Sequence, residues 1–239
     1  MNVHRQAGSD GGEAVVSLDE VGFNYDGRPI LTRITASLVP GTFNFLTGPS
    51  GAGKTTLLQL LSLELRPTAG SLSMFGDPTA GLDRQATSRL RRRIGIVFQD
   101  FRLLDHLSVA ENVVVPLRIA GLRAEERQRD LSDLLDWVGL ANRGDARPPE
   151  LSAGEKQRTA IARAVINAPD LILADEPTGN VDPEMAGKLM RLLTELNRQG
   201  KTVLVATHDL GLVRSVKGQV AARVLRLGQG TLSQGASDL

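Results

Sequence analysis

A glycine-rich segment that ends in a lysine and two threonines carries the strongest chemical signal in the sequence. Residues 48–55 match the pattern G-x-x-x-x-G-K-[ST], between an apolar run over 43–47 and a helical run over 56–65. Such glycines let backbone N–H groups face phosphate oxygens, and a helix N-terminus adds its dipole. A plain glycine turn before a helix is the alternative, which the flanking runs disfavour. The predicted nucleotide-binding residues here are Gly48, Ser50, Gly51, Gly53, Lys54, Thr55 and Thr56.

Two adjacent carboxylates end an apolar run over 171–174 and complete the predicted chemistry. Lys54 is expected to contact the β- and γ-phosphates, while the Thr55 hydroxyl and Asp175 are expected to bind Mg²⁺. Glu176 is expected to accept a proton from the attacking water as a general base. Acidic side chains that simply cap a strand in solvent are the alternative. Beside a phosphate-binding loop, however, the pair predicts hydrolysis of a nucleoside triphosphate.

The apolar runs predict a sheet that brings these side chains to one edge. Runs over 94–98, 171–174 and 202–206 alternate with helical stretches, which is the α/β pattern of parallel strands covered by helices. Ligands gather at the C-terminal ends of such strands. His208 follows the last run, so it is expected to reach the γ-phosphate there. An ordinary surface histidine is the alternative.

Smaller units surround this sheet. Short β-type runs over 15–46 predict antiparallel strands, the face formed by leucines and a valine over 124–138 predicts a helix, and the glycines near 228–230 predict a hairpin over 224–232. We expect a flexible tail over 1–14 and one domain over 15–239, with a core of 15–99 and 169–239 and a mainly helical subdomain of 100–168.

Composition limits the partners and the location. The chain has 239 residues, is 41% hydrophobic and carries a net charge of +1, so no global field draws it to nucleic acid. It has no cysteine, and no segment has the features of a secretory signal or a membrane span. We expect it in the cytosol, with another chain supplying any span. The arginines at 89, 91, 92 and 93 are interpreted as a solvated helix face, not a nucleic-acid or lipid site.

The segment Leu151–Arg158, which stands shortly before the two carboxylates, resembles the LSGGQ signature of the ABC (ATP-binding cassette) ATPases. Locally, Ser152 and Glu155 form a capping-box pattern that opens a helix running to Asn167. Both interpretations can hold together. In the family, the capped N-terminus of this helix, here Ser152 with the exposed amide of Gly154, points at the γ-phosphate held by a second subunit. The resemblance therefore implies a homodimer that forms on ATP binding.

The resemblance extends over about 15–232 and assigns further residues. It implies that Tyr25 stacks on adenine, that Gln99 lies near Mg²⁺ and the attacking water, that Asp182 is the D-loop aspartate, and that His208 is the switch histidine. Two positions depart from the family pattern, since Ala153 replaces the first signature glycine and Glu155 replaces its glutamine. The extra methyl group of Ala153 leaves its contribution to ATP contact open.

Within this family, the stretches Val97–Leu104 and Asp175–Asp182 are most similar to the bacterial cell-division ATPases. That resemblance implies work with an integral membrane subunit of the FtsX type, at the cytoplasmic face of the bacterial inner membrane, and control of cell-wall hydrolases. We expect the membrane subunit to dock on Asp100–Asn112, directly after Gln99. The alternative is the ATPase subunit of a lipoprotein-release, macrolide-export or other solute-moving transporter, which shares these catalytic residues.

ABC ATPases of DNA repair and chromosome maintenance are a further alternative. They carry long coiled coils between the phosphate loop and the signature. Only 96 residues separate Lys54 from Leu151, and these contain no sustained heptads. The sequence therefore disfavours this class, and no nucleic-acid partner is expected.

Overall fold

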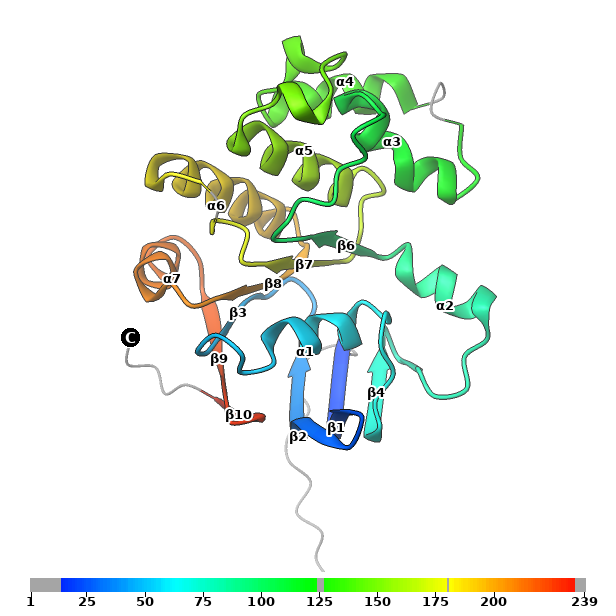
Figure 1. Cartoon of the computed structure of the whole chain (residues 1–239), viewed down its shortest axis with the longest axis vertical. Coiled ribbons are helices and arrows are strands. Elements are labelled where there is room, and N and C mark those ends of the chain that lie inside the picture. The colour runs from blue at the N-terminus through cyan, green and yellow to red at the C-terminus, as the bar shows by residue number, and fades with distance from the viewer. Residues whose placement is uncertain (1–13, 124–126, 180, 235–239) are drawn as a thin grey trace, which may run out of the picture.

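The computed structural model describes residues 14–123, 127–179 and 181–234. Its central element is a mostly parallel sheet. Its strand order is β10-β9-β3-β8-β7-β6, with β10 antiparallel to β9 (Figure 1). The bounds are β3 (Phe43–Thr47), β6 (Ile94–Val97), β7 (Leu171–Asp175), β8 (Thr202–Thr207), β9 (Ala222–Gly228) and β10 (Thr231–Gln234). The α/β fold with a parallel sheet and the C-terminal hairpin are confirmed.

Burial on both faces explains why these strands have continuous apolar sequences. Every residue of β3 and β8 is buried. Leu171 and Leu173 of β7 point into a core cluster with α1 (Lys54–Leu61), whereas Ile172 and Ala174 point into a second cluster with α5 (Ala153–Val165), α6 (Pro183–Arg198) and α7 (Leu210–Lys217). Helices therefore cover both faces, and loops at the strand ends remain accessible.

A second, antiparallel sheet lies at the end of the molecule away from the helices between β6 and β7 (Figure 1). It contains β1 (Val16–Tyr25), β2 (Arg28–Leu38), β4 (Ala69–Met74) and β5 (Asp77–Pro78), in the order β2-β1-β4-β5. The antiparallel strands expected over 15–46 are present as β1 and β2. The sequence did not predict β4 or β5, and it indicated the following α2 (Arg84–Arg91) only through the helix face expected at the arginine cluster.

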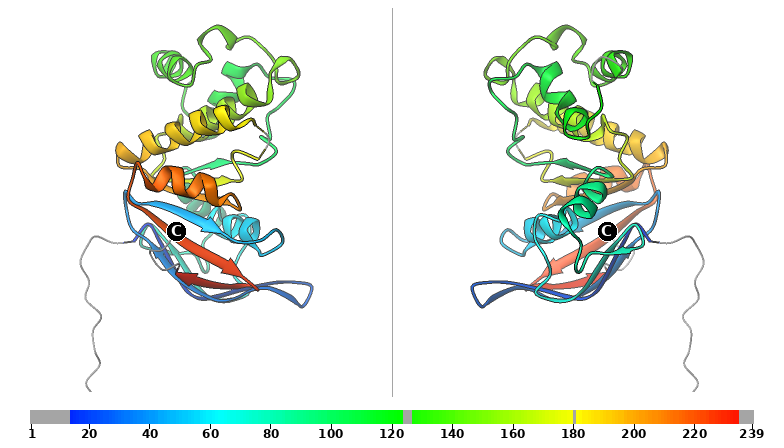
Figure 2. Two further views of the ribbon diagram at one scale, coloured as in Figure 1. Left: turned by 90° about the vertical axis from the view of Figure 1, so that its left-hand side faces the viewer. Right: turned by 90° about the vertical axis from the view of Figure 1, so that its right-hand side faces the viewer.

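A group of helices completes the chain between β6 and β7. It comprises α3 (Val109–Ile119), α4 (Gln128–Trp137), the short 3-10 turns η2 (Ala141–Arg143) and η3 (Pro148–Glu150), and α5, around a third apolar cluster. Figure 2 shows these helices gathered at the end opposite the antiparallel strands.

Several helix bounds differ from the sequence expectation. α1 starts two residues before the expected 56–65 and ends at Leu61, because Leu63 turns into the left-handed region with φ of 61°. α5 ends at Val165 instead of Asn167. The first residues of the helix expected over 124–138, namely 124–126, lie outside the described residues, as do 1–13 of the expected tail.

The arginine cluster is not one solvated helix face, so that interpretation is wrong in part. α2 ends at Arg91, whose guanidinium donates to the Leu63 carbonyl at 2.7 Å. Arg93 lies beyond the helix, pairs with Asp170 at 2.7 Å and stacks over the Phe75 ring. In the described part of the chain, no helix is both long and apolar enough to cross a bilayer.

Candidate active site

The loop between β3 and α1 is shaped by its glycines. Gly53 has φ of 100°, and a Cβ there would lie 2.9 Å from Leu31 Cδ2; a Cβ on Gly48 would lie 2.2 Å from the Leu227 carbonyl oxygen. Other residue types would clash or be strained in this conformation. Gly53 is also the N-cap of α1 and offers no side-chain cap. The backbone N–H groups that open α1 therefore remain available to phosphate oxygens.

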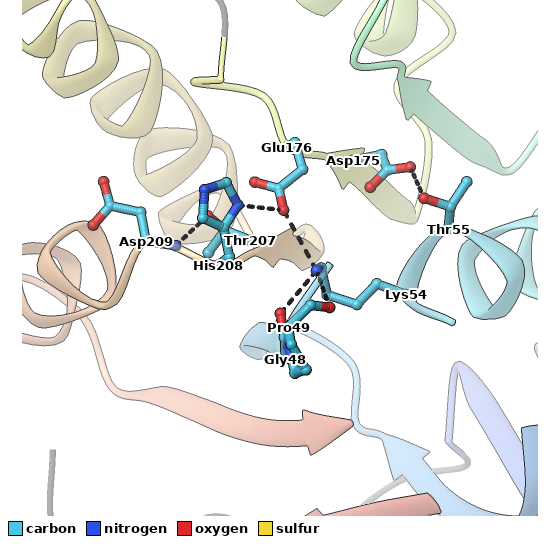
Figure 3. A network of polar contacts seen from close by, with 9 residues as sticks. All are labelled: Gly48, Pro49, Lys54, Thr55, Asp175, Glu176, Thr207, His208 and Asp209. Carbon is cyan, nitrogen blue, oxygen red and sulfur yellow. Dashed lines mark hydrogen bonds and ion pairs between the residues drawn. The ribbon is translucent and has the colours of Figure 1, made fainter. Parts of the chain in front are cut away.

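Lys54 directs its ammonium group back into this loop (Figure 3). Its Nζ donates to the carbonyl oxygens of Gly48 at 2.9 Å and Pro49 at 3.2 Å, and it lies 3.6 Å from Oε1 of Glu176. The Lys54 side chain is only 8% exposed. A largely buried positive charge is thus held where the loop would enclose phosphates.

Asp175 and Thr55 join the end of β7 to the start of α1. The Thr55 hydroxyl donates to Asp175 Oδ2 at 2.8 Å, whereas Asp175 Oδ1 is buried and has no hydrogen-bond partner among the described residues. Burial raises the pKa of the Asp175 carboxyl above its usual value, the bond from Thr55 opposes this shift, and the negative charge of Glu176 adds to it.

The oxygen atoms of Thr55 and Asp175 fit Mg²⁺. A hydroxyl and a carboxylate with an orphaned oxygen are hard donors, which Mg²⁺ prefers, and it commonly takes only one or two carboxylates and completes its shell with water and substrate phosphates. No group of three acidic or histidine side chains able to hold a metal occurs among the described residues. With Thr55 and Asp175 as protein donors, Mg²⁺ would take its remaining ligands from water and substrate phosphates.

Glu176 is held in an unusual conformation at the end of β7. Its φ is 43°, a strained value for a residue other than glycine, and its N–H donates to the Ala206 carbonyl at 2.9 Å. Its side chain is 12% exposed, and Oε1 lies 2.9 Å from Nδ1 of His208. The His208 ring is largely exposed. One carboxylate oxygen thus lies between an imidazole and the Lys54 ammonium.

A cavity of about 540 Å³ contains most of the predicted residues. Ile30 and Pro49 also line it, and sequence reasoning missed both; Ile30 belongs to β2, so no local pattern connects it with the loop. The predicted residues that line the cavity are Ser50, Gly51, Gly53, Lys54, Thr55, Thr56, Gln99, Asp175, Glu176 and His208.

Tyr25 lies apart from this cavity. Its ring packs edge-on against Phe23 with centroids 4.8 Å apart, its hydroxyl lies 3.4 Å from Gln59 Oε1, and the residue is 44% exposed. Gly48 contributes through its carbonyl, which accepts from Lys54.

The signature residues form a second group, outside the cavity. The Ser152 hydroxyl accepts the Glu155 N–H at 3.2 Å and donates to Glu155 Oε2 at 2.9 Å, and the same Oε2 accepts the Ser152 N–H at 2.8 Å. The bond from the Ser152 amide holds the pKa of Glu155 below its usual value, with burial opposing. The expected capping box is present, and it uses both the hydroxyl and the N–H of Ser152.

Gly154 and Asp182 both lie beside Met185 and do not line the cavity. A Cβ on Gly154 would lie 3.0 to 3.3 Å from atoms of the Met185 side chain, and Asp182 caps α6 by accepting the Met185 N–H at 2.9 Å. The starts of α5 and α6 thus bring together Ser152, Gly154 and Asp182, outside the cavity that contains Lys54.

Comparisons with known proteins agree with this architecture. An ABC transporter profile matches residues 31–179. The chain is 44% identical over 209 residues to the cell division ATP-binding protein FtsE of Escherichia coli (strain K12), covering 87% of this chain and 92% of that protein. Identity to FtsE of Streptococcus pneumoniae serotype 2 is 39% over 210 residues, covering 87% and 91%.

Solved structures extend the comparison to the fold. The post-hydrolysis dimer of the ATP-binding cassette MJ0796, bound to ADP and Pi, has a TM-score of 0.81 at 34% identity, covering 92% of this chain and 98% of that one. The cbiO1 protein of Clostridium perfringens has a TM-score of 0.82 at 29% identity, covering 93% and 88%. The site and these likenesses lead to one conclusion: the chain belongs to the ABC transporter family, as an ATP-binding subunit.

Proposed function

We propose that this chain hydrolyses ATP to ADP and phosphate as an FtsE-like subunit, working with an FtsX-like integral membrane subunit in bacterial cell division. One observation carries the hydrolytic part. The Glu176 carboxylate lies between His208 and the Lys54 ammonium, inside the cavity of the phosphate loop. A base beside the cation that holds the phosphates is the arrangement that water attack on the γ-phosphate needs.

Each side chain has a defined task in this proposal. Lys54 and the amides that open α1 bind the phosphates, and a phosphate oxygen replaces the loop carbonyls as the partner of Lys54. Glu176 accepts the proton of the water, while His208 orients the carboxylate. Thr55 and Asp175, with Gln99, would hold Mg²⁺. When bound, that ion neutralises charge developing on the transferred phosphate.

Dimerisation on ATP is part of the proposal. Gly154 in the first turn of α5 offers its backbone N–H, Ser152 caps that end of the helix, and Asp182 lies nearby at the start of α6. None of the three lines the cavity of its own chain. We propose that they face the nucleotide of a second copy, as the similar dimeric cassettes suggest.

The membrane subunit is proposed to dock on Asp100–Asn112, at the boundary between a core of 15–99 and 169–239 and a helical subdomain of 100–168. The FtsE names of the relatives support this choice of partner. We propose a peripheral position at the cytoplasmic face of the inner membrane, and transmission of ATP-driven movement to cell-wall hydrolases.

Purification of the tagged full chain from its own cells in detergent would test the proposal. An FtsX-like subunit should co-purify, and the complex should release phosphate from ATP in the presence of Mg²⁺. Recovery of a lipoprotein-release or macrolide-export subunit would replace the cell-division role with a transport role. Phosphate release that Glu176→Gln leaves unchanged would refute the assigned chemistry.

A further inference from the structure

The backbone directly after Gln99 makes a turn that its residues do not favour. Phe101 has φ of 60° and Arg102 has φ of 47°, so two consecutive residues with bulky side chains lie in the left-handed region. Such residues rarely adopt this conformation, because Cβ approaches the following carbonyl oxygen. A conformation of this kind persists only where surrounding groups hold it.

Arg163 supplies that restraint. Its Nη2 donates to the Phe101 carbonyl and its Nη1 to the Arg102 carbonyl, both at 2.6 Å. One planar guanidinium thus binds two successive carbonyl oxygens, a geometry that a lysine cannot reproduce. The Arg102 side chain is directed elsewhere, over the Phe98 ring and 3.4 Å from Asp100.

Arg163 belongs to α5, the helix that opens with the capping box at Ser152. The two positions are eleven residues apart, which corresponds to about 16 Å along a helix. The same helix lies directly on β6, since a Cβ on Gly95 would be 2.3 Å from the Ala164 carbonyl oxygen. One rigid helix therefore contacts the strand that leads to Gln99, holds the turn that follows it, and presents the signature residues at its other end.

We infer that Arg163 is a positioning residue for ATP hydrolysis, which fixes the turn after Gln99 to the signature helix so that Gln99 and Ser152 keep one relative placement. The inference rests on the proposed function, because it assigns Gln99 and Ser152 to the reaction. Arg163 acts through Gln99 and touches no reacting atom. Its loss should leave nucleotide binding by Lys54 and the phosphate loop intact while hydrolysis fails.

Steady-state ATP hydrolysis and the affinity for a fluorescent ATP analogue would be measured on the full chain and its complex. Arg163→Leu should lower kcat by about 10- to 100-fold, the loss typical of a small misplacement in an active site, with affinity within about twofold. The kcat of Arg163→Lys should lie between those of Arg163→Leu and the wild type. Arg91→Leu is the matched control, because it also removes a guanidinium bond to a carbonyl, that of Leu63 at 2.7 Å.

A double-mutant cycle with Gln99→Ala separates positioning from general destabilisation. If Arg163 acts through Gln99, adding Arg163→Leu to Gln99→Ala should change kcat by less than threefold, whereas Arg91→Leu should have the same effect in both backgrounds. Equal losses from Arg163→Leu in both backgrounds, unchanged kcat, or parallel losses of affinity and kcat overturn the inference. If Arg163→Leu does not fold, Arg163→Lys carries the same cycle. A wild-type complex that does not hydrolyse ATP instead refutes the proposed function.

Discussion

Nδ1 of His208 lies 2.9 Å from Oε1 of Glu176, which links the ends of two neighbouring parallel strands, β8 and β7. The backbone reinforces the link, because the Glu176 N–H donates to the Ala206 carbonyl of β8. The backbone bond fixes the place from which the Glu176 side chain starts, and the His208 contact holds its carboxylate near Lys54. The register of the sheet therefore sets the position of the proposed base relative to the phosphate loop.

Glu176→Gln should retain ATP binding and lose hydrolysis. The amide keeps the shape of the side chain and can still contact His208, but it cannot accept a proton from water. We expect kcat to fall by about 10²- to 10⁴-fold, the usual contribution of a general base. Phosphate release and fluorescent-nucleotide binding, measured on the same preparation, would check this. Turnover within a few-fold of wild type would remove Glu176 from the role of base.

Lys54→Ala should lose nucleotide affinity. The ammonium bonds the carbonyl oxygens of Gly48 and Pro49 and lies 3.6 Å from Glu176, and among the described residues no other lysine or arginine lines the cavity to replace it. Loss of one charge-assisted interaction corresponds to about 10- to 100-fold in Kd. Titration with a labelled ATP would measure it. Lys201→Ala is the control, since Lys201 also bonds a backbone carbonyl, that of Ala168; equal effects of the two variants would contradict the assignment.

Asp175 should make the ligand-free protein less stable as pH rises. Burial raises the folded-state pKa of this carboxyl above its unfolded value, so the folded chain binds the proton more tightly. The stability contributed by the protonated group is complete below the ordinary aspartate pKa and is lost as pH rises through the raised pKa. Asp175→Asn should remove this loss and raise Tm at neutral pH without nucleotide.

The same variant should abolish activity that depends on Mg²⁺, because the amide supplies no negative charge for the ion. Thermal unfolding from pH 4 to pH 8, with and without Mg²⁺ and ATP, would separate the two effects. A lower Tm for Asp175→Asn at neutral pH in the ligand-free protein would contradict the argument from burial.

The sequence predicted those parts of the site that rest on local spacing. The strand–loop–helix unit around Lys54 is recognisable because the glycines, the lysine and the apolar run are contiguous. The pair Asp175 and Glu176 is visible for the same reason. Once parallel strands are inferred, their C-terminal ends must meet at one edge, and His208 follows.

The remaining features depend on contacts between distant segments. Ile30 reaches the cavity from β2, and Arg163 reaches the carbonyls of Phe101 and Arg102 across about sixty residues of sequence. No local pattern encodes such pairs. β4 was missed because its sequence is short and contains few large apolar residues, and tertiary packing decides its conformation.

A mixture of two inactive variants, one altered at Lys54 and the other at Ser152, should contain heterodimers with one working ATP site. In the proposed dimer, each nucleotide uses Lys54 of one copy and Ser152 of the other. Lys54→Ala and Ser152→Arg should each be inactive alone, but a heterodimer would contain one intact site. A statistical mixture should then recover up to about a quarter of wild-type activity, if sites act independently.

Ser152 is exposed, so arginine can be accommodated there without disturbing the core. Ser132→Arg, at an exposed serine of α4, is the matched control and should be active alone. Phosphate release by equimolar mixtures would be compared with that of each variant. A mixture no more active than its better component would argue against a shared site, or for strict coupling between the two sites.

The apolar side chains within Asp100–Asn112, the proposed docking surface for the membrane subunit, differ in how far they are exposed. Phe101 and Leu103 are partly buried and pack against the core cluster of α5, α6 and α7, so less of each side chain is open to a partner. Leu104 differs, because it is 41% exposed. Of the apolar side chains proposed for docking, it is therefore the one that a partner can reach most directly.

The backbone at Leu104 is held rigidly although its side chain faces outward. The buried Asn112 accepts the Leu104 N–H at 2.8 Å and donates to the carbonyl oxygens of Leu104, Leu107 and Ser108. A preformed backbone presents an apolar anchor at little entropic cost, which favours recognition of a partner helix. Leu104→Asp should therefore abolish capture of the membrane subunit while the fold remains intact.

Capture of the FtsX-like subunit in detergent, thermal unfolding and nucleotide binding would be measured for Leu104→Asp. Val39→Asp is the control, since Val39 is 37% exposed and lies in the turn between β2 and β3. We expect capture to fall at least tenfold for Leu104→Asp alone, with Tm and nucleotide binding unchanged, because a buried hot-spot anchor typically carries more than about 1.4 kcal/mol. Retained capture, or an equal loss for Val39→Asp, would show that the membrane subunit docks elsewhere.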